Sequence, residues 1–363
     1  MSKLIKCFII CLLLFPIGKI SAQLPPSTIP FELKAQFNGQ YDYEIIGNTL
    51  NEFDNWQTPP PPCQMLTESS ATLDLEPDQD IVAAYLYWSG IGDGQFNPQI
   101  QLNGELIFAS EINVVDPDQF GFAFYFGSFK DVTEIIEQQG NGLYLFSNLD
   151  LNPILGSYCS TAQYHAGWSI LVIYEDDTLP IQQLNVYDGF ASVIGFGDSA
   201  STTIDIGSLN IIDTQDARMG YLAWNGSPNL FFNESISFNG NLLSNPPLNP
   251  IDNPFNGTNS YTGANDLYNM DLDFFDISDY IQVGDTNASI TFSSTFTRFL
   301  QNVVTVIRSE LPDAQVELVG FSGTGECDER DFNIENIVSN FEASDVLPAN
   351  TPISFFVLDE NGD

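Results

Sequence analysis

The chain has 363 residues, of which 43% are hydrophobic and 13% aromatic, and its 48 acidic residues outnumber nine Lys and Arg to give a formal charge of −39. The hydrophobic share excludes a chain that is disordered by composition. The charge excludes a nucleic-acid-binding surface and disfavours anionic membranes, because no stretch of the chain could neutralise phosphate groups.

The first 22 residues have the pattern of a signal peptide. Lys3 and Lys6 precede an apolar run, CFIICLLLFPIG, which is too short to span a bilayer, and the small residue Ala22 lies at the expected cleavage point. An N-terminal membrane anchor is the alternative. We expect segment 1–22 to be removed, which leaves a mature charge of 6 − 48 = −42. The chain is then secreted, and its mature part does not insert into a membrane.

Three cysteines remain beyond the signal peptide, namely Cys63, Cys159 and Cys327. In an oxidising compartment the natural pair is Cys63–Cys159, which closes a long loop. Cys327 is then odd, so it is either free or paired with a residue beyond Asp363.

Short strands dominate the rest of the chain. Runs rich in β-branched and aromatic residues are bounded by Gly, Asn, Asp and Pro at 81–88, 99–102, 120–126, 143–147, 168–174 and 303–307. The Asn-Gly pairs at 103–104, 239–240 and 361–362 are hairpin signals. Helical patterns are confined to one or two turns near 131–138 and 276–281. The sequence therefore predicts an all-β protein of sandwich or jelly-roll type.

An internal repeat divides the chain. The segment AYLYWSG, which begins at residue 84, returns as GYLAWNG at 220, and IQLNGELI at 100 returns as ISFNGNLL at 236, so both matches are 136 residues apart. Repeats in the same order indicate a duplicated unit. We expect Tyr85 and Trp88 to be structural anchors equivalent to Tyr221 and Trp224.

These patterns predict five parts. A signal peptide (1–22) and an N-terminal extended segment (23–62) precede two tandem β-sandwich units at 63–199 and 200–312. Strand signals at 314–321, 332–340 and 352–358 indicate the start of a third, immunoglobulin-like β-sandwich at 313–363. The last Asn-Gly turn has no second strand, so we expect the chain to be the front part of a longer protein.

Few residues suggest chemistry. His165 is the single histidine, and a nucleophilic pair with Cys159 would need a free thiol within hydrogen-bond reach. With 48 acidic residues, a carboxylate pair suited to a glycosidase arises by chance. Tyr164 and Trp168 are candidates for a sugar-binding platform, because aromatic faces stack on sugar rings, although most aromatic residues of a sandwich lie in its core.

Structural calcium is the one cofactor that the sequence leaves open. Asp271, Asp273 and Asp276 place three carboxylates close together, and hard cations require several converging oxygen atoms. A solvated strand face gives the same alternation without an ion. No other cofactor and no catalytic residue is expected.

The segments at 70–75, 84–88, 131–133, 140–144, 167–175 and 186–190 together resemble the N-terminal β-region of large modular surface proteins of gliding, Bacteroidota-type bacteria. The chain from residue 316 is similar to the start of a cell-adhesion module. The resemblance implies a non-catalytic, adhesin-like protein, secreted or attached to the cell surface through a missing C-terminal domain. Its partner would be an extracellular glycan or a surface or matrix protein. A carbohydrate-active enzyme or its accessory module is the alternative.

Overall fold

A computed structural model describes residues 25–93, 99–117, 123–194, 200–230, 233–309, 314–322 and 333–340, together with 347 and 351. The expected signal peptide, Cys327 and the strand expected at 352–358 lie outside these residues. The described chain is built almost wholly from antiparallel strands, which confirms the predicted all-β sandwich class. None of its helices is both long enough and apolar enough to cross a membrane.

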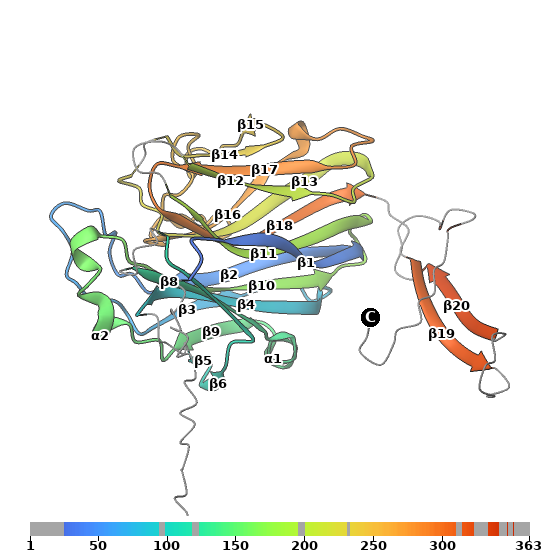
Figure 1. Cartoon of the computed structure of the whole chain (residues 1–363), viewed down its shortest axis with the longest axis horizontal. Helices are drawn as coiled ribbons and strands as arrows, with labels where there is room; N and C mark the ends of the chain where they lie inside the picture. Colours follow the sequence, from blue (N-terminus) through green and yellow to red (C-terminus); the bar gives the residue numbers. More distant parts are fainter. Residues whose placement is uncertain are drawn as a thin grey trace, which may run out of the picture.

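Four sheets stack to form the main body (Figure 1). One outer sheet has the order β3-β9-β5-β6, with the bounds Glu68–Leu73, Gly142–Ser147, Ile100–Leu102 and Glu105–Ile107. The central sheet next to it has the order β2-β10-β4-β8-β7, with the bounds Tyr41–Thr49, Ala166–Glu175, Asp80–Gly92, Phe124–Asp131 and Glu111–Val115. These two sheets form the first sandwich.

The second sandwich has the same construction. Its central sheet has the order β1-β11-β18-β13-β16, with the bounds Ile29–Gly39, Gln182–Val193, Arg298–Ser309, Ile211–Trp224 and Met270–Asp276. Its outer sheet has the order β12-β17-β14-β15, with the bounds Ala200–Ile206, Ala288–Ser294, Ser235–Phe238 and Asn241–Leu242. Short helical turns connect the strands at α1 (Thr133–Gln139), α2 (Asn152–Leu155), η1 (Cys159–Thr161) and η2 (Ser278–Tyr280).

Burial explains the two kinds of strand in the sequence. The central sheets are covered on both faces, so β10 is buried at every position except its last residue and reads as a nearly unbroken apolar run. β9 of an outer sheet alternates, with Tyr144 and Phe146 buried and Leu143 and Leu145 exposed. One apolar core fills the first sandwich and the space between the central sheets, and a second core fills the other sandwich.

The predicted Asn-Gly hairpins occupy equivalent places in the two sandwiches. Asn103 and Asn239 have φ values of 50° and 48°, and they turn the chain from β5 to β6 and from β14 to β15. The backbone N–H of Asn103 donates to the Leu145 carbonyl over 2.8 Å, and that of Asn239 donates to the Ser289 carbonyl over 2.8 Å. Each Asn side chain accepts the N–H of the same partner residue in return.

The aromatic anchors of the repeat lie in different layers, contrary to the prediction. Trp88 is paired with Trp168, whose indole N–H donates to a β3 serine hydroxyl, so both tryptophans face the outer sheet. Trp224 instead faces away from its own sandwich and stacks on His165 between the two central sheets. Tyr85 is only partly buried. All four predicted anchors therefore pack inside the protein, three of them buried and Tyr85 partly buried, but Trp88 and Trp224 are not equivalent.

A shift of three residues explains the difference. The N–H of Val132 donates to the Ala84 carbonyl before one helical turn, and the N–H of Ile277 donates to the Ala217 carbonyl before the other. These strands therefore correspond at an offset of 217 − 84 = 133 residues rather than 136. Successive residues of a strand face opposite sides, so an odd shift reverses the face. Tyr221, not Trp224, occupies the place of Trp88 and packs inside the second sandwich.

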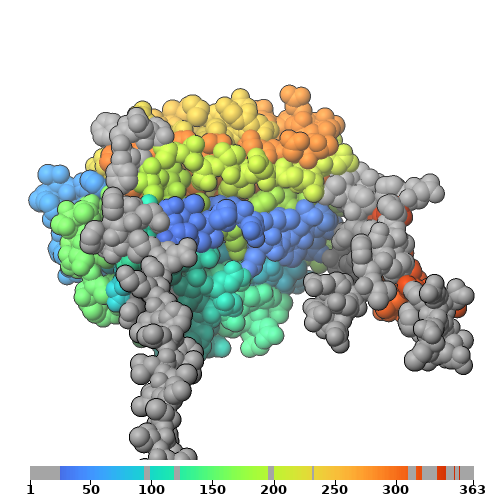
Figure 2. Space-filling model, viewed as in Figure 1, coloured from blue at the N-terminus to red at the C-terminus, as the bar shows by residue number. Residues whose placement is uncertain are grey.

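The N-terminal segment is part of both sandwiches, whereas the sequence placed it outside them. β1 pairs with β11 and β2 pairs with β10, so the two strands join different central sheets. Figure 2 shows this N-terminal part, in blue, running across the middle of the molecule. β11, expected in the unit 63–199, pairs with β18 of the other sandwich. Strand pairing thus crosses the boundary that the repeat suggested at residue 200.

The predicted disulfide between Cys63 and Cys159 is confirmed. Their Cα atoms lie 5.8 Å apart, within the range of ordinary disulfides. The bond ties the segment before β3 to η1. At the C-terminal end of the described chain, β19 (Ala314–Ser322) and β20 (Asn333–Asn340) form a two-stranded antiparallel sheet. The immunoglobulin-like module expected there stays a prediction.

Candidate functional site

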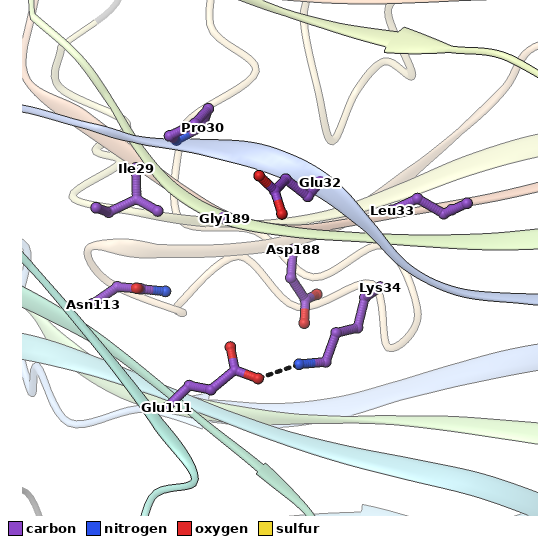
Figure 3. Close-up of a pocket in the computed structure, with 9 residues that line it drawn as sticks. All are labelled: Ile29, Pro30, Glu32, Leu33, Lys34, Glu111, Asn113, Asp188 and Gly189. Carbon is purple, nitrogen blue, oxygen red and sulfur yellow. Dashed lines mark hydrogen bonds and ion pairs between the residues drawn. The ribbon is translucent and has the colours of Figure 1, made fainter. Parts of the chain in front are cut away.

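A pocket of about 370 Å³ opens beside β1, where the two central sheets meet (Figure 3). Its walls come from β1, β7 and β11, strands that are far apart in the sequence. Three carboxylates, one ammonium group and one carboxamide share the lining with apolar side chains. The lining residues are Ile29, Pro30, Glu32, Leu33, Lys34, Glu111, Asn113, Asp188 and Gly189.

Asp188 has one fixed carboxylate oxygen and one without a partner. Oδ1 accepts hydrogen bonds from the Tyr87 hydroxyl over 2.7 Å and from Asn302 Nδ2 over 3.0 Å. Oδ2 is buried and accepts no hydrogen bond within the part of the chain that the structure describes. Burial raises the pKa of Asp188 to about 6, against the opposing effect of these two donors. Above that pH an ionised oxygen in this position is a strong acceptor for a ligand N–H or O–H.

Lys34 and Glu111 close one side of the pocket. Their ion pair joins β1 to β7, and Lys34 Nζ lies 3.9 Å from the centroid of the Phe129 ring. The two side chains are 27% and 50% exposed, so the pair contributes at most about 1 kcal/mol to stability. Because three carboxylates face a single ammonium group, the pocket repels anions and suits a neutral ligand that donates hydrogen bonds.

The backbone of β11 beside Asp188 lies very close to the backbone of β1 at Gly189. A Cβ atom on Gly189 would lie 2.9 Å from the Pro30 carbonyl oxygen and 3.0 Å from Phe31 Cα, so a side chain here would push β1 away. The pairing of β11 with β18 is irregular between Asp188 and Ala191. Such irregularities redirect side chains and are common beside functional sites.

A second pocket, also of about 370 Å³, lies between β2, β3 and the segment 259–267. Glu44 lines it, and burial raises the pKa of this carboxyl group to about 7. Asp188 and Glu44 therefore line different pockets and cannot act together on one substrate.

The aromatic platform expected at Tyr164 and Trp168 is not formed. Tyr164 is 3% exposed and Trp168 is fully buried. Trp168 stacks on Phe146, with the ring centroids 5.6 Å apart, inside the first sandwich. These rings are core residues, and no sugar could stack on them without unfolding this layer.

His165 and Cys159 do not form a nucleophilic pair. Cys159 is in the disulfide, and His165 is fully buried between the central sheets. His165 Nε2 lies 2.8 Å from Ser89 Oγ, whose single proton is donated to the Phe126 carbonyl. Nε2 is therefore the protonated nitrogen, and Nδ1 has no hydrogen-bond partner among the described residues. Burial lowers the pKa of His165 to about 3, which keeps the ring neutral.

The three aspartates considered for calcium separate into two environments. Asp271 and Asp273 are fully buried on β16, where their side chains face the interior of the second sandwich. Asp276 is exposed, and its carboxylate accepts the N–H of Ser278 at the start of η2. Among the described residues no group of three His, Cys, Asp or Glu side chains is arranged to hold a metal ion.

Comparison with known proteins gives only distant structural neighbours. No protein-family model matches the chain, and no curated protein matches it. Crystal structures of BuGH86 with neoagarooctaose are 10% identical, with TM-scores of 0.23 and 0.22, over 78% of this chain and 34% of theirs. The C-terminal domain of AspA, an antigen I/II-family protein of Streptococcus pyogenes, is 8% identical over 75% of this chain and 93% of that domain, with a TM-score of 0.10.

Likenesses this weak leave the function open, and the chain spans about a third of the length of the BuGH86 chains. Fold and pocket define an all-β double-sandwich protein with an acidic cavity beside its N-terminal strand.

Sequence reasoning missed Asp188, the residue on which this pocket depends. It lies in the run VYDGF at 186–190, which entered only as one of the segments that resemble the surface proteins. An Asp-Gly pair inside an apolar strand was the available signal, because a strand glycine often marks a bulge or close backbone approach.

Proposed function

We propose that the protein is a non-catalytic binding protein that holds a neutral, hydroxyl-rich glycan in the pocket lined by Asp188, Glu111 and Lys34. The observation that carries the proposal is that Asp188, whose buried Oδ2 has no partner among the described residues, lines a cavity of about 370 Å³. A sugar hydroxyl would donate to this oxygen, and the Asn113 side chain can donate to or accept from a neighbouring hydroxyl.

The charge of the pocket limits the class of glycan. Three carboxylates line it, and the whole chain carries a net charge of −39. Sulfated or uronic-acid sugars would be repelled, so we expect neutral sugars to bind. Secretion or display at the cell surface, proposed from the N-terminal sequence, would bring the pocket into contact with extracellular glycans. The resemblance to modular surface proteins supports the same setting.

A glycosidase is the second candidate. Asp188, with a pKa of about 6, is suited to donate a proton, and Glu32 and Glu111 line the same pocket. We favour binding because the resemblance to modular surface proteins implies no catalytic residue, and because Glu111 already forms an ion pair with Lys34.

A glycan array probed with the full chain tests the proposal, with Asp188→Asn as the site variant and Asp74→Asn as the matched control. Asparagine keeps the Oδ1 contacts of Asp188 but replaces the free oxygen with an amide, while Asp74 is exposed after β3. We expect neutral glycans to be retained by the native protein and by Asp74→Asn, and lost by Asp188→Asn. Retention that is equal in all three proteins, or retention of anionic glycans alone, would overturn the proposal.

The same array separates the alternatives. Reducing ends released from the retained glycans by the native protein, and not by Asp188→Asn, would establish the glycosidase. Binding to an immobilised matrix protein with no glycan retained would move the site away from this pocket.

A further inference from the structure

The long connection between β15 and β16 is built around two buried acids. Asp271 and Asp273 project from β16 into the second sandwich, opposite Ala223 and Tyr221 of β13. In the first sandwich, β8 corresponds to β16, because each of these strands leads into an equivalent helical turn. The residues at the corresponding positions of β8 are Phe126 and Ser128, which lie opposite Gly90 and Trp88. The first sandwich therefore forms the same fold with no carboxylate at these two positions.

Asp271 has one satisfied oxygen and one without a partner. Oδ1 accepts the backbone N–H groups of Asn256 and Gly257, each over 2.7 Å. Oδ2 has no hydrogen-bond partner within the described protein, although the side chain is fully buried. A Cβ atom built on Gly226 would lie 2.0 Å from Asp271 Oδ2 and 2.9 Å from the Phe255 carbonyl oxygen. Both acceptor oxygens therefore lie beside Gly226.

The hydroxyl group of Thr258 has more acceptor oxygens around it than it can donate hydrogen bonds to. Its Oγ1 lies 2.9 Å from Asn249 Oδ1, 2.6 Å from Asn256 Oδ1 and 2.9 Å from Asp273 Oδ2. A hydroxyl has one proton, so it can satisfy only one of these three oxygens. The orientation of the Asn256 amide is fixed, because its Nδ2 donates to the Leu248 carbonyl over 2.8 Å.

More oxygen atoms converge on Asp273. The Ser260 hydroxyl donates to Oδ1 over 2.6 Å. The Tyr221 hydroxyl donates to the Pro254 carbonyl over 2.6 Å and lies 3.4 Å from Oδ2. Calcium takes six to eight oxygen ligands at about 2.3–2.6 Å, so neighbouring ligand oxygens lie roughly 3 Å apart, as they do here. The nearby buried cation, Arg298, already pairs with Glu234 over 2.7 Å.

We propose that the buried oxygen cluster of Asp271, Asp273, Asn249, Asn256 and Thr258 is a calcium site that fastens the 243–269 connection to the end of the second sandwich. Two buried carboxylates without a cation are costly, and a cation removes this cost. Carboxylate oxygens from β16, together with amide and hydroxyl oxygens from the 243–269 connection, suit calcium better than magnesium, which demands a near-ideal octahedron. Asp276, exposed on the same strand, takes no part.

Thermal unfolding of the full chain tests the site, measured in chelator, in calcium chloride and in sodium chloride of matched ionic strength. We expect calcium at a hundredfold excess over Kd to raise the Tm by about 5 °C beyond matched salt. Asp273→Asn should lose this increment, and the matched control Asp276→Asn should keep it. Equal Tm values in the three solutions for the native protein would overturn the proposal, as would an increment that Asp273→Asn retains.

Terbium luminescence gives a second readout that does not require Asp273→Asn to fold. Tyr221 lies against Asp273, so excitation of tyrosine should sensitise terbium bound by the native protein, and calcium should displace it. Tyr221→Phe should reduce this emission while keeping the calcium-dependent Tm increment. Emission that calcium does not displace would identify unrelated surface binding and overturn the site. The pocket at Asp188 is elsewhere in the fold, so either result leaves the glycan proposal to its own test.

Discussion

Replacing His165 with phenylalanine should remove an acid sensitivity that is built into the space between the central sheets. The histidine ring is fully buried and stacks between Tyr125 and Trp224, at centroid distances of 5.7 and 5.6 Å. Phenylalanine keeps both ring contacts and has no proton to gain. It loses the hydrogen bond to Ser89, which we expect to cost about 1 kcal/mol at every pH.

The magnitude follows from the pKa of His165, which burial lowers to about 3, while a histidine in the unfolded chain titrates near 6.5. As the pH falls below about 6.5 the unfolded chain gains a proton that the folded protein cannot accept, so stability is lost between pH 6.5 and 3. From pH 7 to pH 5 this one residue should cost the native protein about 2 kcal/mol. His165→Phe should not show that loss.

Urea denaturation at pH 7, 6 and 5, followed by tryptophan fluorescence, gives the difference in unfolding free energy between the two proteins. Buried carboxyl groups with raised pKa values, such as Glu234, change stability in the opposite direction, but they are common to both proteins and cancel. The difference should move in favour of His165→Phe by about 2 kcal/mol between pH 7 and 5. A difference that stays constant over this range would show that His165 is protonated in the folded state and refute the reasoning.

Two further predictions concern covalent and ionic contacts. Cys159→Ser should lower the unfolding free energy by about 4–5 kcal/mol in denaturant, because the bridged residues are 96 apart, and adding Cys63→Ser should cost nothing more if the bridge is the cause. Glu234→Gln should cost about 3–5 kcal/mol, since it leaves the fully buried Arg298 unpaired, and the double change Glu234→Gln, Arg298→Met should recover part of that loss; an equally unstable double variant would contradict this account.

Local signals predicted the parts of the fold that depend on local structure. The Asn-Gly turns at Asn103 and Asn239 need only a left-handed backbone at two residues, which the sequence states directly. The pairing of Cys63 with Cys159 could be predicted because these are the two mature cysteines that fall within the predicted unit 63–199. The all-β class followed from many short strands between turn residues.

The parts that were missed depend on contacts between distant segments. The face on which Trp224 lies reverses with a three-residue shift of β13, and a motif match at a constant offset cannot detect it. Trp168 was a candidate for a sugar-binding platform because aromatic faces stack on sugar rings, yet a whole outer sheet covers it. The pocket at Asp188 needs β1, β7 and β11 together, and nothing in the local sequence pairs those strands.

The pH dependence of glycan affinity tests the assignment of the Asp188 pocket most directly. A neutral glycan retained on the array would be titrated into the native protein and into Asp188→Asn at pH 7.5 and pH 5. With a pKa of about 6, Asp188 is ionised at the higher pH and about one-tenth ionised at the lower, so the native affinity should fall roughly tenfold. Asp188→Asn should bind about 10- to 100-fold more weakly than the native protein at pH 7.5. The affinity of this variant should be the same at pH 5 as at pH 7.5. Equal affinity of the two proteins at pH 7.5, or a native affinity that does not change with pH, would contradict the assignment of this pocket as the binding site.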